Sequence, residues 1–182
     1  MKYLSMHIQD ILENSVRAKA SEIKLIINDS KAENLITVVF SDNGCGMDAE
    51  MVRNVLDPFT TTRTTRKIGL GLSLFQQNAQ RCGGDLSISS QVGIGTTVTV
   101  TFQRNNIDLP PWGDLAGTLV QLMISYREIN FIYSHTTSNG EFSVQSAELL
   151  EIICENGIPV LSMINPVVEM INNNLQEIGA FN

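Results

Sequence analysis

The chain has 182 residues and a mass of 20.1 kDa, with 43% hydrophobic and 17% charged residues. This length allows one full domain with its own core and a small addition, and it excludes two large domains. A net charge of -7 and a pI near 4.7 argue against nucleic acid or an anionic membrane as a partner. No apolar run approaches the ~20 residues of a membrane span, and Cys45, Cys82 and Cys154 form no Cys-x-x-Cys pair. We therefore expect a cytoplasmic globular protein.

The first predicted element is an amphipathic helix from about residue 4 to residue 18, because apolar residues recur there every three or four positions. Asp10 and Asn14 stand four residues apart and share one face of this helix. An asparagine oxygen is a suitable single ligand for Mg²⁺, which takes its other ligands from water and phosphates. Asp10 would then orient or deprotonate a nucleophile. The alternative is that both side chains belong to the solvated face of the helix.

Two β-rich runs, 23–27 and 35–40, predict a hairpin whose second strand ends in an Asp-x-Gly-x-Gly turn. Gly44 and Gly46 permit a positive φ and leave no Cβ between the backbone and a ligand, so that a flat ring can approach. A buried Asp42 would accept a hydrogen bond from an exocyclic amine such as that of adenine. The alternative is a tight turn between strand and helix in which Asp42 acts only as a cap.

The segment after this turn is predicted to form a short helix, a polar threonine-rich loop and a second helix, at about 48–56, 57–68 and 69–82. Gly69 and Gly71 lie at the start of the second helix, where free amides and the helix dipole favour phosphate. The alternative is a solvated basic loop before an ordinary glycine-rich helix start. Three basic residues of the loop support the phosphate hypothesis: Arg63, Arg66 and Lys67.

A change of composition at residues 105–113, which contain Pro110-Pro111, indicates a joint that divides the chain into 1–104 and 105–182. Two half-buried strands precede this joint, at 86–89 and 97–102. The second part is predicted to contain a helix at 114–125, a hairpin of 131–133 and 142–144, a helix at 146–155 capped by Ser146, and a final helix that ends near 178.

Five motifs follow one another in the first part: Asp10–Ser15, Asp42–Met47, Asp57–Arg63, Gly69–Leu72 and Gly95–Thr97. In this order they resemble the GHKL ATPase superfamily, which includes the ATP-binding domains of gyrase, heat-shock chaperones, histidine kinases and mismatch-repair proteins. The resemblance covers about residues 5–103 and is closest to the catalytic domain of histidine kinases. It implies an α+β Bergerat fold, a two-layer sandwich in which helices cover a mixed, mainly antiparallel sheet. Residues 105–182 would then form a small α+β C-terminal extension.

The resemblance also implies ATP and Mg²⁺ as cofactors. Asn14 would bind Mg²⁺, Asp42 would bind the adenine amine, and Thr96 would lie near adenine. Of the glycines, Gly44 and Gly46 would lie beside the base, whereas Gly69 and Gly71 would lie at the phosphates. The full predicted set is Asp10 as the catalytic residue and, for cofactor binding, Asn14, Asp42, Gly44, Gly46, Met47, Arg63, Lys67, Gly69, Leu70, Gly71 and Thr96.

The chain departs from the histidine kinases in three respects. Lys67 stands where those kinases usually have a glycine, and Asp10 stands where hydrolysing members have a glutamate, which leaves hydrolysis open. Only nine residues precede Asp10, which leaves no room for the usual helix pair with a phosphoacceptor histidine. His7 itself is expected to be structural.

These features leave two hypotheses for the function. In the first, the protein is a stand-alone ATPase or a protein kinase that acts on a separate partner or phosphoacceptor protein. In the second, it is a non-hydrolysing module that senses ATP or ADP and signals through a partner. The C-terminal part would seat that partner or form a homodimer interface, or it would only complete the core.

Overall fold

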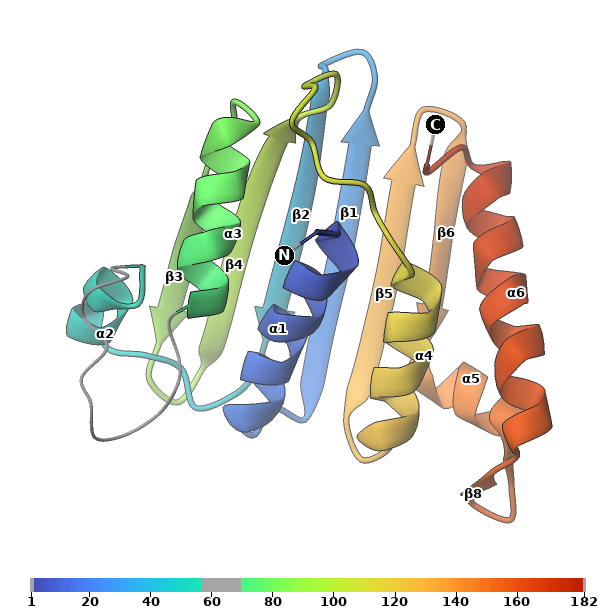
Figure 1. The fold of residues 1–182 in the computed structure, drawn as a ribbon. Helices are drawn as coiled ribbons and strands as arrows, with labels where there is room; N and C mark the ends of the chain where they lie inside the picture. Colours follow the sequence, from blue (N-terminus) through green and yellow to red (C-terminus); the bar gives the residue numbers. More distant parts are fainter. Residues whose placement is uncertain (1, 57–69, 182) are drawn as a thin grey trace.

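The computed structural model describes residues 2–56 and 70–181. Helices cover one face of a six-stranded sheet (Figure 1). The helices are α1 (Leu4–Arg17), α2 (Ala49–Asn54), α3 (Leu70–Arg81), α4 (Leu115–Ser125), α5 (Ser146–Ile153) and α6 (Leu161–Glu177). The strands are β1 (Glu22–Ser30), β2 (Leu35–Asp42), β3 (Leu86–Gln91), β4 (Gly95–Gln103), β5 (Asn130–Thr137) and β6 (Gly140–Gln145), and β7 (Cys154–Glu155) and β8 (Ile158–Pro159) form a separate small hairpin.

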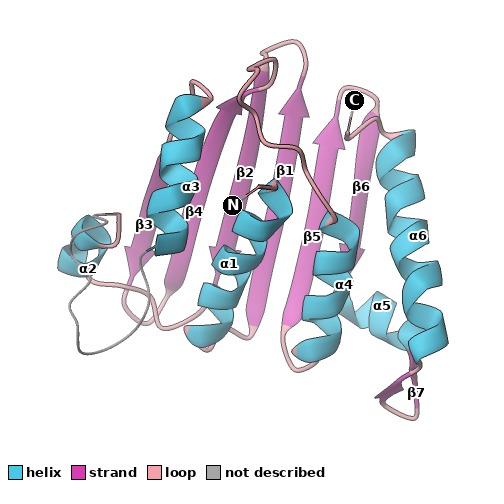
Figure 2. Ribbon diagram, in the orientation of Figure 1, coloured by secondary structure: helices cyan, strands magenta, loops and turns pink. Residues whose placement is uncertain are grey.

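The six strands lie in the order β3-β4-β2-β1-β5-β6, and each neighbouring pair is antiparallel except β1 and β5. The register places Ile26 of β1 opposite Val39 of β2, and Asp42 of β2 opposite Thr96 of β4. Helices α1, α3, α4 and α6 lie side by side on one face of this sheet (Figure 2). The structure thus confirms the predicted α+β sandwich with a mixed, mainly antiparallel sheet.

The core forms where the alternating side chains of the strands meet the apolar stripes of the helices. In β1, Ile23, Leu25 and Ile27 are buried, whereas the intervening Ile26 remains 41% exposed. On α1, the residues that face the sheet recur with helical spacing and include Ile8, which is fully buried. Each such side chain contributes about 1.5–3 kcal/mol through burial. The strand and helix periods of the sequence therefore determine which face of each element enters the core.

The helices and strands predicted from the sequence are confirmed in kind within the described ranges, whereas the predicted loop at 57–68 lies outside them. The predicted joint at residue 105 falls between β4 and α4, and the sheet continues across it because β5 pairs with β1. The connection also contacts α1, since the backbone N–H groups of Leu4 and Ser5 donate to the carbonyls of Pro111 and Trp112 at 2.9 Å each. The division into two domains at this point stays a prediction.

The start of α5 differs from the prediction that Ser146 caps it. The N-cap is Gln145, whose backbone N–H donates to the carboxylate of Glu148 at 3.3 Å. Ser146 is instead buried, and its hydroxyl donates to the carbonyl of Ile129 and accepts from the N–H of Phe131. The serine therefore links the helix to β5, and the helix ends at Ile153, where the hairpin of β7 and β8 begins.

No helix within residues 2–56 and 70–181 has both the length and the apolar character needed to cross a bilayer.

Candidate functional site

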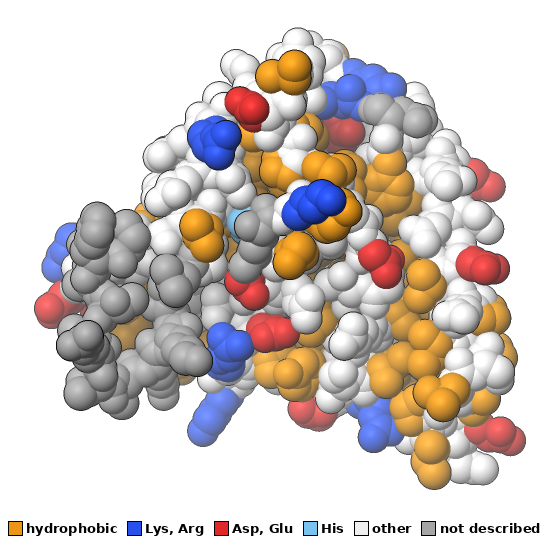
Figure 3. All heavy atoms as spheres, viewed as in Figure 1, with side chains coloured by type: hydrophobic (Ala, Val, Ile, Leu, Met, Phe, Trp, Pro, Cys, Tyr) orange, Lys and Arg blue, Asp and Glu red, His pale blue; other side chains and the backbone are white. Residues whose placement is uncertain are grey.

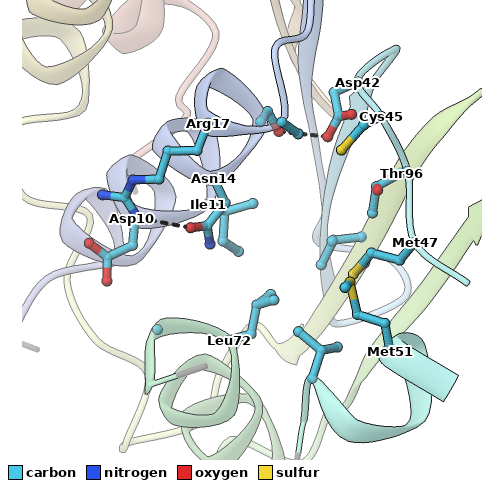
Figure 4. A pocket seen from close by; sticks show the side chains of 16 residues that line it. Asp10, Ile11, Asn14, Arg17, Asp42, Cys45, Met47, Met51, Leu72 and Thr96 are labelled. Carbon is cyan, nitrogen blue, oxygen red and sulfur yellow. Dashed lines mark hydrogen bonds between the residues drawn. The ribbon is translucent and has the colours of Figure 1, made fainter. Parts of the chain in front are cut away.

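A cavity of about 790 Å³ opens between the helix layer and the sheet, at the end of β2. Figure 4 shows Asp10 and Asn14 on one side of it, with Thr96 and Met47 on the other. Its polar lining consists of Asp10, Asn14, Ser15, Arg17, Asp42 and Thr96. Its apolar lining includes Ile11, Met47, Met51, Val55, Leu72 and Val98. An apolar cavity of this volume with convergent polar groups is typical of a small-molecule site.

Most of the predicted site residues that the structure describes converge on this cavity, although they come from distant parts of the sequence. Those that line it are Asp10, Asn14, Asp42, Gly46, Met47, Gly71 and Thr96. Gly44 is not among the lining residues. Leu70 begins α3, but its side chain lies outside the described part of the structure, as do Arg63, Lys67 and Gly69.

Helix α1 places Asp10 and Asn14 one turn apart, both half-buried at the cavity. The start of α3 approaches this carboxylate closely, because a Cβ added to Gly71 would lie 2.9 Å from Asp10 Oδ2. Burial raises the pKa of Asp10, and the nearby Glu13 carboxylate raises it further. A carboxylate with a raised pKa is a stronger base than an ordinary surface aspartate. The geometry is thus compatible with a general base on α1.

Arg17 is a site residue that the sequence analysis missed. Its guanidinium donates to Asn14 Oδ1 at 3.2 Å and to Glu13 Oε2 at 3.0 Å. It therefore covers the oxygen that was predicted to bind Mg²⁺. The spacing offered a signal, because a residue three positions after Asn14 lies on the same side of a helix.

The carboxylate of Asp42 is oriented by two hydrogen bonds within the protein. Ser15 Oγ donates to Asp42 Oδ2 at 2.7 Å, and the N–H of Gly44 donates to Asp42 Oδ1 at 2.9 Å. Each oxygen keeps a second lone pair that can accept from a ligand. Asp42 is half-buried, not buried as predicted, because it lines the open cavity. Ser15, which the sequence analysis also missed, is 5% exposed on the inner face of α1.

The two glycines of the turn serve close packing within the protein. Gly46 has φ +65, and a Cβ added to it would lie 2.0 Å from the carbonyl oxygen of Gln91. Gly44 does not adopt a positive φ, which corrects the prediction, and its added Cβ would lie 2.8 Å from Ala18 Cβ. Gly44 therefore allows the turn to pack on the end of α1, whereas Gly46 allows it to pack on the end of β3.

Thr96 belongs to a hydroxyl network that fixes its orientation. Ser90 Oγ accepts from the N–H of Met47 at 2.8 Å and lies 2.9 Å from both the carbonyl of Gly95 and Thr96 Oγ1. The Ser90 hydroxyl has one proton, and a carbonyl can only accept, so the proton goes to Gly95 and Thr96 donates to Ser90. Thr96 Oγ1 then keeps its lone pairs for an acceptor role at the cavity. Ser90 itself was not predicted.

Two solved structures have a fold similar to that of this chain. The N-terminal domain of a DNA repair protein matches with a TM-score of 0.54 at 18% identity, and covers 80% of this chain and 52% of that chain. The MutL ATPase domain of Aquifex aeolicus, complexed with ADP, matches with a TM-score of 0.51 at 15% identity, and covers 93% of this chain and 70% of that chain. At these identities the likeness defines the fold alone, which is the α+β sandwich predicted above.

The family itself follows from the sequence match. Residues 2–106 match the model of the histidine kinase-, DNA gyrase B- and HSP90-like ATPases, and the chain belongs to this family. The tetrathionate sensor histidine kinase TtrS of Salmonella typhimurium is 33% identical over 107 residues, which are 57% of this chain and 18% of that kinase. The histidine kinase AtoS of Escherichia coli is 33% identical over 105 residues, 56% of this chain and 17% of that kinase. The chain thus spans less than a fifth of the length of these relatives.

Proposed function

We propose that the cavity binds Mg²⁺-ATP and that the protein uses it as an ATPase or as a protein kinase that acts on a separate partner. The observation that carries this proposal is the convergence of Asp10, Asn14, Asp42 and Thr96 on one cavity. In this arrangement Asp42 and Thr96 would contact the base, because hydrogen bonds within the protein orient their oxygens at the cavity. Asp10 and Asn14, on the opposite wall, would face the phosphates.

The donor set fits a magnesium ion that phosphates help to hold. Asn14 Oδ1 lines the cavity and would be the protein ligand of the ion, with water and phosphate oxygens as the others. When bound, the ion would neutralise charge on the phosphates. Arg17 would have to release Asn14 Oδ1 first, and its guanidinium would then be free to contact the phosphates.

Transfer to a separate acceptor is favoured by the positions of the two histidines of the sequence. His7 and His135 are both fully buried. His7 stacks on Phe75 with ring centroids 4.7 Å apart, and its Nε2 lies 2.8 Å from Asn78 Nδ2. Neither ring is accessible to a γ-phosphate, so a histidine acceptor would lie outside these 182 residues. In transfer to a serine acceptor Asp10 would take the proton from the attacking hydroxyl, and in hydrolysis it would take the proton from the attacking water.

A second candidate function is a nucleotide-sensing module without turnover. Two features favour it. Asp10, which lies close to the start of α3 at Gly71, is one methylene shorter than the glutamate of hydrolysing members. The guanidinium of Arg17 also covers Asn14 Oδ1, the atom expected to bind Mg²⁺. In this reading, nucleotide binding would displace Arg17 and alter the surface that a partner contacts.

ADP release from Mg²⁺-ATP tests the proposal when ATP binding is measured in parallel. We expect wild type to bind ATP and release ADP, and Asn14→Ala to lose release at least about tenfold. Binding without release in wild type would exclude the stand-alone ATPase and leave the sensing module and a kinase that awaits its partner. Absence of ATP binding in wild type would contradict both functions.

A further inference from the structure

The C-terminal part of the chain exposes three large apolar side chains within ten residues. Ile152 at the end of α5 is 47% exposed, Ile158 in β8 is 69% exposed, and Leu161 at the start of α6 is 81% exposed. The backbone holds these elements together, because the N–H of Val160 donates to the carbonyl of Ile153 at 2.8 Å. Figure 3 shows hydrophobic side chains gathered over the hairpin and the adjoining end of α6. We call Ile152, Ile158 and Leu161 the C-terminal apolar surface.

Acidic side chains lie next to the C-terminal apolar surface. Glu155 pairs with Ile158 across the hairpin, so their side chains are neighbours. Glu148 and Glu151 are exposed on α5, four residues and one residue before Ile152. Acidic side chains also appear at the margin of the same face in Figure 3. Carboxylates on the hairpin and on α5 thus adjoin the apolar surface.

The charge of the whole chain is concentrated in this part. Residues 105–182 contain nine acidic side chains and one basic side chain, Arg127, whereas residues 1–104 contain ten acidic and eleven basic side chains. The guanidinium of Arg127 donates to the carbonyl of Gly157 in the small hairpin. The positive charge of Arg127 is therefore directed at the backbone of the hairpin. The carboxylates make the electrostatic potential around the C-terminal apolar surface negative.

We propose that the C-terminal apolar surface binds a basic amphipathic segment of a partner protein. The apolar side of such a segment would cover Ile158 and Leu161, and its lysine or arginine side chains would reach Glu151 and Glu155. The same carboxylates disfavour an anionic membrane or nucleic acid. They also disfavour a second copy of this chain in a symmetric contact, because the acidic rim would then meet itself.

The proposal is independent of nucleotide binding. The C-terminal apolar surface lies beyond α4 and the edge strand β6, whereas the cavity lies between α1, α2 and α3 at the other end of the sheet (Figure 1). A partner that binds there would leave the cavity open. ATP binding and partner binding can therefore be tested separately, with variants of the cavity for the first and variants of the C-terminal apolar surface for the second. Failure of one proposal would leave the other intact.

The test uses a fluorescein-labelled synthetic helix of about 18 residues, with leucine along one face and lysine elsewhere, titrated with the full chain in fluorescence anisotropy. We expect saturable binding that Ile158→Ser with Leu161→Ser weakens at least about tenfold. Glu151→Gln with Glu155→Gln should weaken binding about threefold or more and reduce its salt dependence. A matched helix with glutamate in place of lysine should bind at least about tenfold more weakly.

The control is a second exposed apolar pair, Val92→Ser with Ile94→Ser on the turn between β3 and β4, where the side chains are 65% and 63% exposed. This variant should bind the lysine helix as wild type does. Equal binding by the Ile158 and Leu161 double variant and by wild type would overturn the proposal. Sedimentation that shows self-association of the wild type, lost in the same double variant, would also overturn it and identify a second copy as the occupant.

Discussion

The two ends of the sheet carry the same layer of helices but differ in what the helices leave open. At the end formed by β4, β2 and α1 to α3, polar side chains from α1, β2 and β4 meet around a cavity of about 790 Å³. At the other end, α4 and α6 close over β5 and β6 with buried apolar residues such as Leu119 and Ile171. The site therefore arises where polar residues interrupt the apolar face of α1, not from a different fold.

Each end of the sheet also contains one fully buried histidine, and the two histidines differ in their partners. His7 of α1 packs against α3, with an amide partner in Asn78. His135 lies under the rings of Trp112 and Phe181, with its Nδ1 2.9 Å from the hydroxyl of Tyr133. Burial is the first cause that lowers the pKa of both histidines to about 4. Both therefore act as neutral packing groups at physiological pH.

The largest expected effect comes from Asp10 at the open end. Asp10→Asn should lower ADP release at least about 100-fold, because the amide cannot accept a proton, and should change ATP affinity less than about threefold. The rate of wild type should fall at acidic pH as Asp10 is protonated, at a pH above its ordinary pKa because that pKa is raised. A coupled ADP-release assay over pH measures both.

Glu13→Gln is the matched control for this experiment, since Glu13 is the neighbouring carboxylate on α1 but does not line the cavity. It should keep most of the ADP release. A loss in this variant as large as in Asp10→Asn would remove the role of base from Asp10.

The next largest effect is a loss of stability when Gly46, in the turn that lines the cavity, is replaced. Gly46→Ala should destabilise the protein by about 2–4 kcal/mol, because its Cβ would collide with the Gln91 carbonyl. Gly93→Ala has a similar positive φ of +76 but no atom within 4 Å of the added Cβ, so it should cost about 1 kcal/mol. Urea unfolding compares the two variants, and equal costs would refute the steric role of Gly46.

The closed end should be sensitive to pH through His135. Its folded pKa of about 4 lies below the value of 6.5 expected in the unfolded chain, so the unfolded state binds more protons between these values. Stability should therefore fall as pH drops from about 6.5 to about 4, with a contribution from this histidine of no more than about 3 kcal/mol. Urea unfolding at several pH values measures the slope. His135→Phe should flatten it, and an unchanged slope would contradict the account.

The smallest effect is expected for Arg17. Arg17→Ala should change the free energy of unfolding by less than about 0.5 kcal/mol, because its contacts with Glu13 and Asn14 are exposed. Arg104→Ala is the contrasting variant, since Arg104 Nε lies 2.5 Å from the carboxylate of Asp29, which is 3% exposed. It should cost about 2 kcal/mol or more. Similar costs in urea unfolding would show that burial does not decide the contribution of these pairs.

The elements and part of the cavity were predictable from local signals, whereas the place of Thr96 came from the resemblance to the GHKL family. Asp10 and Asn14 share a face through helical spacing, and the turn at Gly46 requires a positive φ that glycine supplies. The contacts that orient the site were not predictable in this way. Ser15 lies 27 residues from Asp42, and Ser90 lies 43 residues from Met47. Such pairs depend on the register of the sheet and on how closely α1 packs on it. The spacing of apolar residues in the sequence contains no information on either.

Asp42 is the residue on which ATP binding in the cavity should depend most directly. Calorimetric titration of Mg²⁺-ATP into wild type, Asp42→Asn and Asp48→Asn tests it most directly. Asp48 is the matched control, because it lies in the same segment but caps α2 through the N–H of Met51. We expect Asp42→Asn to weaken ATP binding tenfold or more, on the order of a lost hydrogen bond to a charged group, and Asp48→Asn to bind as wild type does. Absence of ATP binding by wild type, or equal affinity in all three proteins, would contradict the account.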